Sequence, residues 1–210
     1  MHAVVQLPPM PVATDYSRFV YAHPDNPDLQ VKVVRPDVLA DYRRGDVPWR
    51  KRLRRIGPYG VLLRELRESL AVRSRHPQDE LPLAQVLGCV STNLGMGLLL
   101  RAQRDADGAL SPTLAQALHR PDAARLDLPA ALDRLRDALL RYGVIVGNPK
   151  LSGIVLVDAG STAQRLVLTE GFGEKNLIPR CSISGRFNAA NTRRRFARLQ
   201  LQLRRRLAPA

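Results

Sequence analysis

The sequence has few cysteines, few aromatic residues and almost no lysine, and the first two shortages already narrow its class. Cys89 and Cys181 are the only cysteines in 210 residues, and they lack the spacing of a metal site. We therefore expect two reduced thiols, because a single distant pair does not make a disulfide framework. Aromatic residues make up 5% of the chain, so the core should consist mainly of Leu, Val and Ala.

Long apolar runs are missing too. No stretch approaches the roughly 20 apolar residues that a membrane-spanning helix needs. The first fifteen residues contain three prolines and no basic region ahead of an apolar core, which is unlike a secretory signal. These features predict a cytoplasmic protein without a membrane span.

The familiar enzyme motifs do not occur. The histidines are isolated from one another and from cysteine, which excludes the usual zinc spacing; they are His2, His23, His76 and His119. No G-x-S-x-G nucleophile motif is present. The glycines at 143, 147 and 153 match neither the dinucleotide-binding nor the Walker spacing.

Positive charge is abundant, and arginine supplies nearly all of it. The net charge is +14, although lysine occurs only at 32, 51, 150 and 175. Arginines cluster at Arg43–Arg55 and Arg193–Arg206, which is typical of a polyanion-binding surface. Solvated faces and the arginine bias of a GC-rich genome explain the clusters equally well. The candidate polyanion contacts are Arg193, Arg194, Arg195, Arg204, Arg205 and Arg206.

The first structural unit expected is an antiparallel hairpin. Two β-prone runs, Phe19–Tyr21 and Leu29–Val34, flank the turn-forming segment HPDNPD. Strand alternation puts Lys32 on the opposite face from its β-branched neighbours Val31 and Val33. A lone lysine in such a strand is either a solvent-facing edge charge or part of a site.

The first long helix is expected over Tyr59–Arg73. The spacing predicts one buried face that consists of Tyr59, Leu62, Leu63, Leu66 and Leu70. Two acids share this helix. Glu65 lies at the rim of the predicted face, where it could turn inward or form a surface ion pair, and Glu68 should point to water.

The remaining pattern predicts strands, then mostly helices, and a late strand pair. The expected elements are strands at Leu83–Thr92 and Gly95–Arg101, a helix capped by Ser111, a helix at Leu128–Tyr142, strands at Ile154–Val157 and Leu166–Leu168, and a basic helix at Asn191–Leu207. This order indicates an α+β fold. It divides into an extended leader (1–15), a strand-rich lobe (16–102) and a mainly helical lobe (103–210).

One arrangement of polar residues has a chemical meaning. Lys32 lies in a strand, Glu65 on the first long helix, Asn148–Gly153 before a late strand, and Glu170 after the next strand. A lysine can hold phosphates, a helix carboxylate can orient that lysine, and a polar loop with a second carboxylate can hold metal ions and a hydroxyl. The order therefore matches the layout of a phosphotransfer site.

Three phrases extend this match to a family. SRFVYAHPDNPDLQVKVVRP, VLGCVSTNLGMGLLLRAQRDADGALSPTL and LVLTEGFGEKNLIP resemble the bacterial YrbL family of PhoP-regulatory-network proteins. That family is itself similar to protein kinases in fold. The resemblance covers about Ser17 to Arg198 and implies a bilobal, protein-kinase-like fold.

The resemblance also implies roles for single residues. Lys32 matches the strand lysine that contacts ATP phosphates, and Glu65 matches its helix partner. Asn148 falls at the catalytic aspartate, Gly153 at the metal-binding asparagine, and Glu170 at the metal-binding aspartate. The implied cofactors are ATP and magnesium.

Several positions depart from the kinase pattern. The amide of Asn148 cannot act as a base, Gly153 offers no ligand, and the hairpin lacks a glycine-rich loop, whereas Glu170 could still hold a metal. We therefore expect a pseudokinase-like regulatory or binding protein, with a degraded nucleotide site and a protein partner. Two alternatives remain open. One is an arginine-rich binder of nucleic acid or an anionic surface; the other is an active phosphotransferase using ATP, in which Lys150 or Asp158 compensates.

Overall fold

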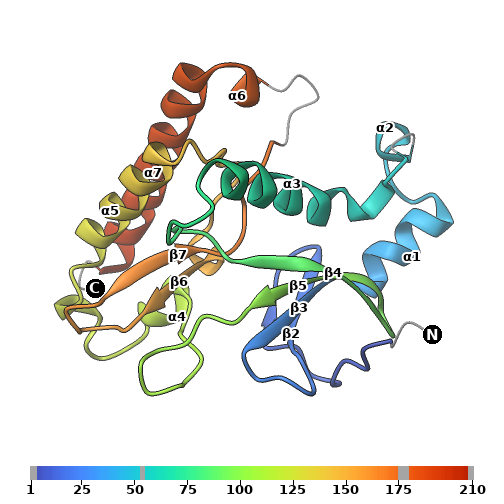
Figure 1. Ribbon diagram of the computed structural model, residues 1–210, viewed down its shortest axis with the longest axis horizontal. Coiled ribbons are helices and arrows are strands. Elements are labelled where there is room, and N and C mark those ends of the chain that lie inside the picture. The colour runs from blue at the N-terminus through green and yellow to red at the C-terminus, as the bar shows by residue number, and fades with distance from the viewer. Residues whose placement is uncertain (1–3, 53–54, 175–179, 208–210) are drawn as a thin grey trace. The chain divides into compact units, whose positions relative to one another are not determined.

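The computed structural model describes residues 4–52, 55–174 and 180–207, and it shows an α+β chain (Figure 1). The chain forms two compact units: the first contains Met1–Leu66 and Gln85–Ala102, the second Arg67–Ala84 and Gln103–Ala210. Four parts of the predicted segments lie outside the described residues. They are residues 1–3 of the leader, 53–54 of the first arginine cluster, 175–179 at the end of the phrase that contains Gly-Phe-Gly, and 208–210 of the helical lobe.

The first unit is built on a five-stranded antiparallel sheet with the order β1-β2-β3-β5-β4. Its strands are β1 (Ala13–Thr14), β2 (Arg18–Ala22), β3 (Leu29–Val34), β4 (Val86–Thr92) and β5 (Gly95–Arg101). The predicted hairpin is confirmed as β2 and β3. Lys32 pairs with Val20 on one side and Leu98 on the other, so the edge-charge interpretation is wrong.

Strand β3 is buried on both faces. Val31 and Val33 pack with Leu7 and Tyr21 on one face. Val34, on the other face, packs with a cluster that includes Leu62. Because side chains alternate along a strand, Lys32 lies on the same face as Val34. This lysine is therefore placed inside the unit, with 1% of its surface exposed.

Side chains from α1 (Pro36–Arg44), a 3-10 turn (Gly57–Tyr59) and α3 (Gly60–Arg75) pack against that face of the sheet. The short helix α2 (Trp49–Arg52) lies between α1 and the 3-10 turn in sequence, and its described residues are exposed. The buried face of α3 is rotated about the helix axis from the predicted one, so the prediction is wrong for part of the helix. Leu70 is 61% exposed, whereas Glu65 and Glu68 are 2% and 5% exposed. The buried side of α3 therefore carries both acids.

The second unit is mainly helical. Its elements are α4 (Leu114–Ala117), a 3-10 turn (Ala123–Arg125), α5 (Leu128–Arg141), a 3-10 turn (Leu151–Gly153), β6 (Ile154–Val157), β7 (Arg165–Leu168), α6 (Arg180–Ile183) and α7 (Gly185–Leu207). The N-cap prediction at Ser111 is wrong. Thr113 caps α4 in a reciprocal capping box with Gln116, and Ser111 instead donates to Asp105.

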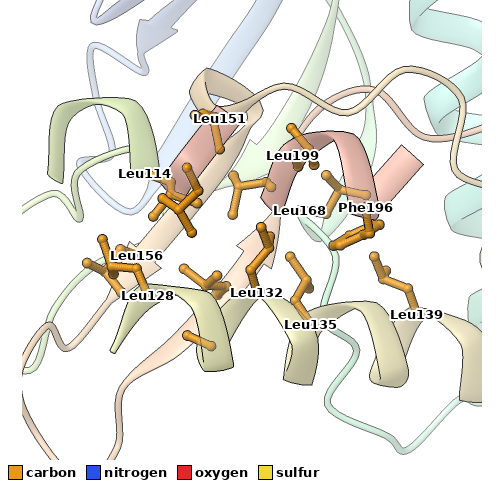
Figure 2. Packing of buried hydrophobic residues seen from close by; sticks show 14 of the residues in the cluster. Leu114, Leu128, Leu132, Leu135, Leu139, Leu151, Leu156, Leu168, Phe196 and Leu199 are labelled. Carbon is orange, nitrogen blue, oxygen red and sulfur yellow. The ribbon is translucent and has the colours of Figure 1, made fainter. Parts of the chain in front are cut away.

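The core of the second unit joins α5, α7 and the β6–β7 pair (Figure 2). Leu132, Leu135 and Leu139 on α5 meet Phe196 and Leu199 on α7, as the apolar stripe of the basic helix predicted. Each fully buried side chain of this size stabilises the fold by about 1.5–3 kcal/mol. Among the described helices, none has the length and apolar character needed to cross a membrane.

Candidate functional site

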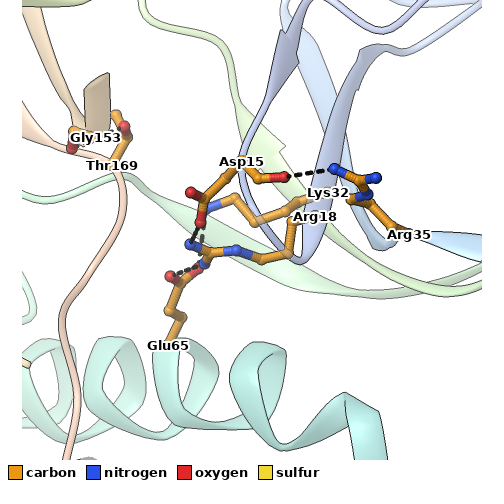
Figure 3. Close-up of polar contacts among 7 residues, drawn as sticks. All are labelled: Asp15, Arg18, Lys32, Arg35, Glu65, Gly153 and Thr169. Carbon is orange, nitrogen blue, oxygen red and sulfur yellow. Dashed lines mark hydrogen bonds and ion pairs between the residues drawn. The ribbon is translucent and has the colours of Figure 1, made fainter. Parts of the chain in front are cut away.

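The first unit contains a buried ion-pair cluster that Figure 3 shows from close by. The Glu65 carboxylate accepts a hydrogen bond from Lys32 Nζ through Oε2 at 2.9 Å. Its other oxygen, Oε1, accepts one from Arg18 Nη1. The second amino group of Arg18 donates to Asp15 Oδ2 at 2.9 Å. The predicted pairing of Lys32 with Glu65 is thus part of a larger network.

Arg18 was not predicted, although the hairpin contains the signal for it. In the β2–β3 register Arg18 is opposite Val34 and Val20 is opposite Lys32. Cross-strand partners share a face, so Arg18 lies on the same face as Lys32. The strand predicted from the sequence began at Phe19, one residue too late, so it did not include Arg18.

The electrostatics of the cluster favour its charged form. Burial alone would raise the pKa of Glu65, but the charges and hydrogen bonds of Lys32 and Arg18 outweigh it and hold that pKa below its ordinary value. The four groups, two cations and two carboxylates, sum to zero charge. Each buried charge therefore has a partner of opposite sign, which is the condition for keeping it inside a protein.

The second unit brings Asn148 and the Glu-Gly-Phe-Gly motif together. The backbone N–H groups of Gly147 and Asn148 both donate to the carbonyl oxygen of Gly171, at 2.7 and 2.8 Å. Gly171 has φ +82°, and a Cβ there would overlap the Asn148 carbonyl, whose carbon would be 2.8 Å away. Only glycine fits this contact without strain. The side chain of Asn148 is exposed.

Gly153 and Glu170 are also in contact. The Gly153 carbonyl accepts hydrogen bonds from the N–H groups of Thr169 and Glu170 at 2.9 and 3.1 Å. A Cβ at Gly153 would lie 2.9 Å from Glu170 Cβ. A metal-binding side chain at 153 therefore has no room unless Glu170 moves.

This geometry does not fit the magnesium ions of a kinase. Gly153 supplies no side-chain ligand, and its carbonyl oxygen already accepts two backbone hydrogen bonds, which leaves Glu170 as the one remaining side chain of the expected pair of metal ligands. Within the described ranges no group of three His, Cys, Asp or Glu side chains could hold a metal ion. Asp158, considered as a substitute, accepts from the N–H of Ala106 at 2.6 Å and lies 3.5 Å from Arg165, so it is engaged in the β6–β7 hairpin.

Three further polar residues fix the segment ahead of Gly147, and the sequence did not indicate their role. Asn188 and Asn191 on α7 donate to the carbonyl oxygens of Val144 and Val146, at 3.0 and 3.2 Å. Glu68 accepts from the N–H of Ile145 at 2.8 Å. The expectation that Glu68 points to water is therefore wrong. Because a buried backbone polar group must be paired, these side chains replace the backbone partners that the irregular segment lacks.

Glu68 differs from Glu65 in its titration. Burial raises the pKa of Glu68, and Glu174 adds to the rise, whereas the hydrogen bond from Ile145 and the charge of Arg75 offset it only in part. The folded state therefore binds a proton at Glu68 more tightly than the unfolded state does. Its contribution to stability is greatest below the unfolded pKa of about 4.3 and falls as the pH rises through the folded pKa.

Glu68→Gln should leave the free energy of unfolding unchanged or raise it by up to about 1 kcal/mol at pH 7, because glutamine keeps an acceptor for Ile145 without a buried charge. Glu68→Leu should lower it by about 1–3 kcal/mol, because the N–H of Ile145 loses its partner. Urea unfolding at pH 7 measures both. A loss of more than about 1 kcal/mol in Glu68→Gln would show that the charge itself stabilises the fold.

The arginines of α7 surround its apolar stripe as predicted. Arg193, Arg194, Arg198 and Arg204–Arg206 are exposed. Arg195 is half-buried and donates to Asn191 Oδ1, and burial together with the charge of Arg194 lowers its pKa. In the first cluster Arg44 forms ion pairs with Asp41 and Asp46, so its charge is partly neutralised.

Comparison with known proteins identifies the family. The model of the family described as PhoP regulatory network protein YrbL matches residues 9–204, so the chain belongs to the YrbL family. No curated protein matches it. Among solved structures the chain is similar to a mutant of the PknI kinase domain from Mycobacterium tuberculosis, with 17% identity and a TM-score of 0.42 over 77% of this chain. The match spans 57% of that domain.

Proposed function

We propose that this YrbL-family protein is a regulatory protein on a kinase-like scaffold, in which the former phosphotransfer site serves as structure. The observation that carries the proposal is the neutral, buried cluster around Glu65. A phosphate-binding lysine must offer positive charge to its ligand. A lysine–glutamate pair alone is compatible with phosphate binding, but here Arg18, which is paired with Asp15, shares the Glu65 carboxylate. Lys32 is also only 1% exposed, so a nucleoside triphosphate would have to displace these groups to reach it.

The loop of the second unit supports the same proposal. The amide at Asn148 has no basicity with which to accept a substrate proton. Gly153 packs against Glu170 at the place where a second metal ligand would be needed. We infer that the close glycine contacts preserve the shape of the loop while the residue types no longer support phosphoryl transfer.

A thermal unfolding experiment tests this proposal. At about 1 mM Mg-ATP the melting temperature should rise by less than about 0.5 °C, because stabilisation follows the ratio of free ligand to Kd. A rise of several degrees that disappears in Lys32→Met would instead show that the site still binds nucleotide.

A second candidate function is the binding of a polyanion, such as a nucleic acid or an anionic surface, by α7. The observation that favours it is the exposure of Arg204, Arg205 and Arg206, none of which forms an ion pair with any described residue. Adjacent unpaired arginines raise the local potential and attract phosphates.

Heparin affinity measures this candidate. Changing Arg204, Arg205 and Arg206 together to Gln should lower the salt concentration at elution, and the slope of log affinity against log salt should fall by about one per lost phosphate contact. The control removes three charges from paired arginines and should change elution less; it is Arg44→Gln, Arg120→Gln and Arg136→Gln. If both variants elute at the same lower salt concentration, heparin binding depends only on the net charge of the protein and not on the arginines of α7.

A further inference from the structure

The second unit carries a surface groove that no part of the proposed function uses. It lies between α5, β7 and the segment of residues 80–82, with a volume of about 330 Å³. Leu81, Leu135 and Leu166 are among its apolar lining residues. This volume is near the lower end of the range of about 300–1,000 Å³ for small-ligand sites, and suits a few apolar side chains.

The rim of the groove is positively charged. Arg134, Arg141 and Arg165 line it, together with one acid, Glu80. Glu80 is 3.5 Å from Arg165, but its side chain is 82% exposed, so this pair is weak. Arg165 also lies 3.5 Å from Asp158, so the positive charge of the rim comes mainly from Arg134 and Arg141.

Two of these arginines have no carboxylate partner among the described residues. Arg134 and Arg141 are seven positions apart on α5, which places them two turns, or about 10 Å, apart on the same side. The neighbouring acids of α5, Asp133 and Asp137, both pair with Arg136 instead. The acids of α5 therefore neutralise Arg136, which does not line the groove, and leave Arg134 and Arg141 able to bind an anionic ligand.

A strand edge also faces the groove. The N–H of Leu168 donates to the Pro82 carbonyl, and the N–H of Ala84 donates to the Leu168 carbonyl, both at 3.0 Å. Strand alternation turns the N–H and C=O of Leu166 to the same side. Pro82 would be the next donor in this parallel pairing, but proline has no N–H. Beyond β6–β7, no backbone hydrogen bond to Leu166 is present in the described part of the chain.

We propose that this groove binds a short extended segment of a partner protein, in which acidic and apolar residues alternate. The apolar side chains rest on Leu81, Leu135 and Leu166. Carboxylates two residues apart lie on one face of the segment about 7 Å from each other, and the long side chains of Arg134 and Arg141 can both reach them. The segment's backbone hydrogen-bonds to Leu166, as in other cases of strand addition to a sheet edge. Charge complementarity selects an acidic partner over a basic one.

The probe is a fluorescein-labelled decapeptide of alternating Glu and Leu, tested by fluorescence anisotropy at low salt. We expect saturable binding that weakens at least about tenfold in the double variant Arg134→Gln/Arg141→Gln. The matched control Arg67→Gln/Arg125→Gln removes the same charge from exposed positions outside the groove and outside α7, and it should bind as the unchanged chain does. Hydrogen exchange should show slower exchange of the Leu166 amide when the peptide is bound.

Several outcomes would overturn the proposal. They are no saturable binding at about 1 mM peptide, unchanged affinity in the double variant, and equal binding of a Lys-Leu decapeptide or of decaglutamate. Equal binding of dodecanoate at the same arginines would assign the groove to a lipid-like carboxylate instead. All four arginines changed here are exposed, so the variants should fold, and none belongs to the Glu65 cluster.

Discussion

Replacing Glu65 with alanine should lower the free energy of unfolding by about 3–5 kcal/mol, because two buried cations lose their shared carboxylate. For a chain of this size the melting temperature should fall by about 6–20 °C. Urea unfolding at pH 7 measures the change directly. Glu80→Ala is the control: its carboxylate is largely exposed, so the expected loss is within about 0.5 kcal/mol.

A second variant shows which partner matters. Lys32→Met should cost less than Glu65→Ala, because Glu65 keeps Arg18 as its partner and methionine fills the apolar part of the site. Equal losses in the two variants would mean that Arg18 adds nothing to the cluster. If Glu65→Ala lowers the free energy of unfolding by less than about 1 kcal/mol, the Glu65 cluster has no structural role.

The pH dependence of the Glu65 term follows from its lowered pKa. A carboxyl whose folded pKa is lowered stabilises the protein above its unfolded pKa, and this contribution is lost as the pH falls from there through the folded pKa. The difference between the unchanged chain and Glu65→Ala should therefore narrow below about pH 4. Glu68, whose pKa is raised, has the opposite sign.

Gly171→Ala should lower the free energy of unfolding by about 2–5 kcal/mol, the sum of left-handed backbone strain and a clash with the Asn148 carbonyl. Gly108→Ala is a matched control. Its φ is +83° against +82° for Gly171, but a Cβ there would meet nothing within 4 Å, so only the strain of about 1–2 kcal/mol applies.

The difference between the two glycine variants isolates the contact between Gly171 and Asn148. Both proteins should be unfolded in urea under the same conditions. If they lose the same stability, Gly171 and Asn148 do not approach each other this closely in solution, and the inference that close glycine contacts preserve the shape of the loop is wrong.

Strands were the most predictable part of the fold. The hairpin Phe19–Val34 and the pair Ile154–Leu168 have β-branched runs, alternation and turn residues that all agree. The apolar stripe of Phe196 and Leu199 on α7 was equally clear, because arginine occupies the other positions. Agreement between local pattern and packing explains these successes.

Helix α3 shows where the sequence misleads. Its leucines predicted one buried face, but the helix turns Glu65 and Glu68 inward and leaves Leu70 exposed. The spacing of apolar residues cannot reveal a buried acid, because the acid's partners come from strands or loops far away in the sequence. Lys32 is such a partner for Glu65, and Ile145 for Glu68. Likewise, Ser111 and Thr113 are both good caps, and only the spacing of Thr113 to Gln116 distinguishes them.

The central claim is that the Glu65 cluster is a self-neutralised structural element, and titration calorimetry with Mg-ATP at 25 °C tests it most directly. The neutral cluster predicts no saturable heat up to about 1 mM nucleotide, which corresponds to binding weaker than about −4 kcal/mol. Saturable binding with a Kd below about 100 µM, abolished by Lys32→Met in a protein that remains folded, would contradict the claim.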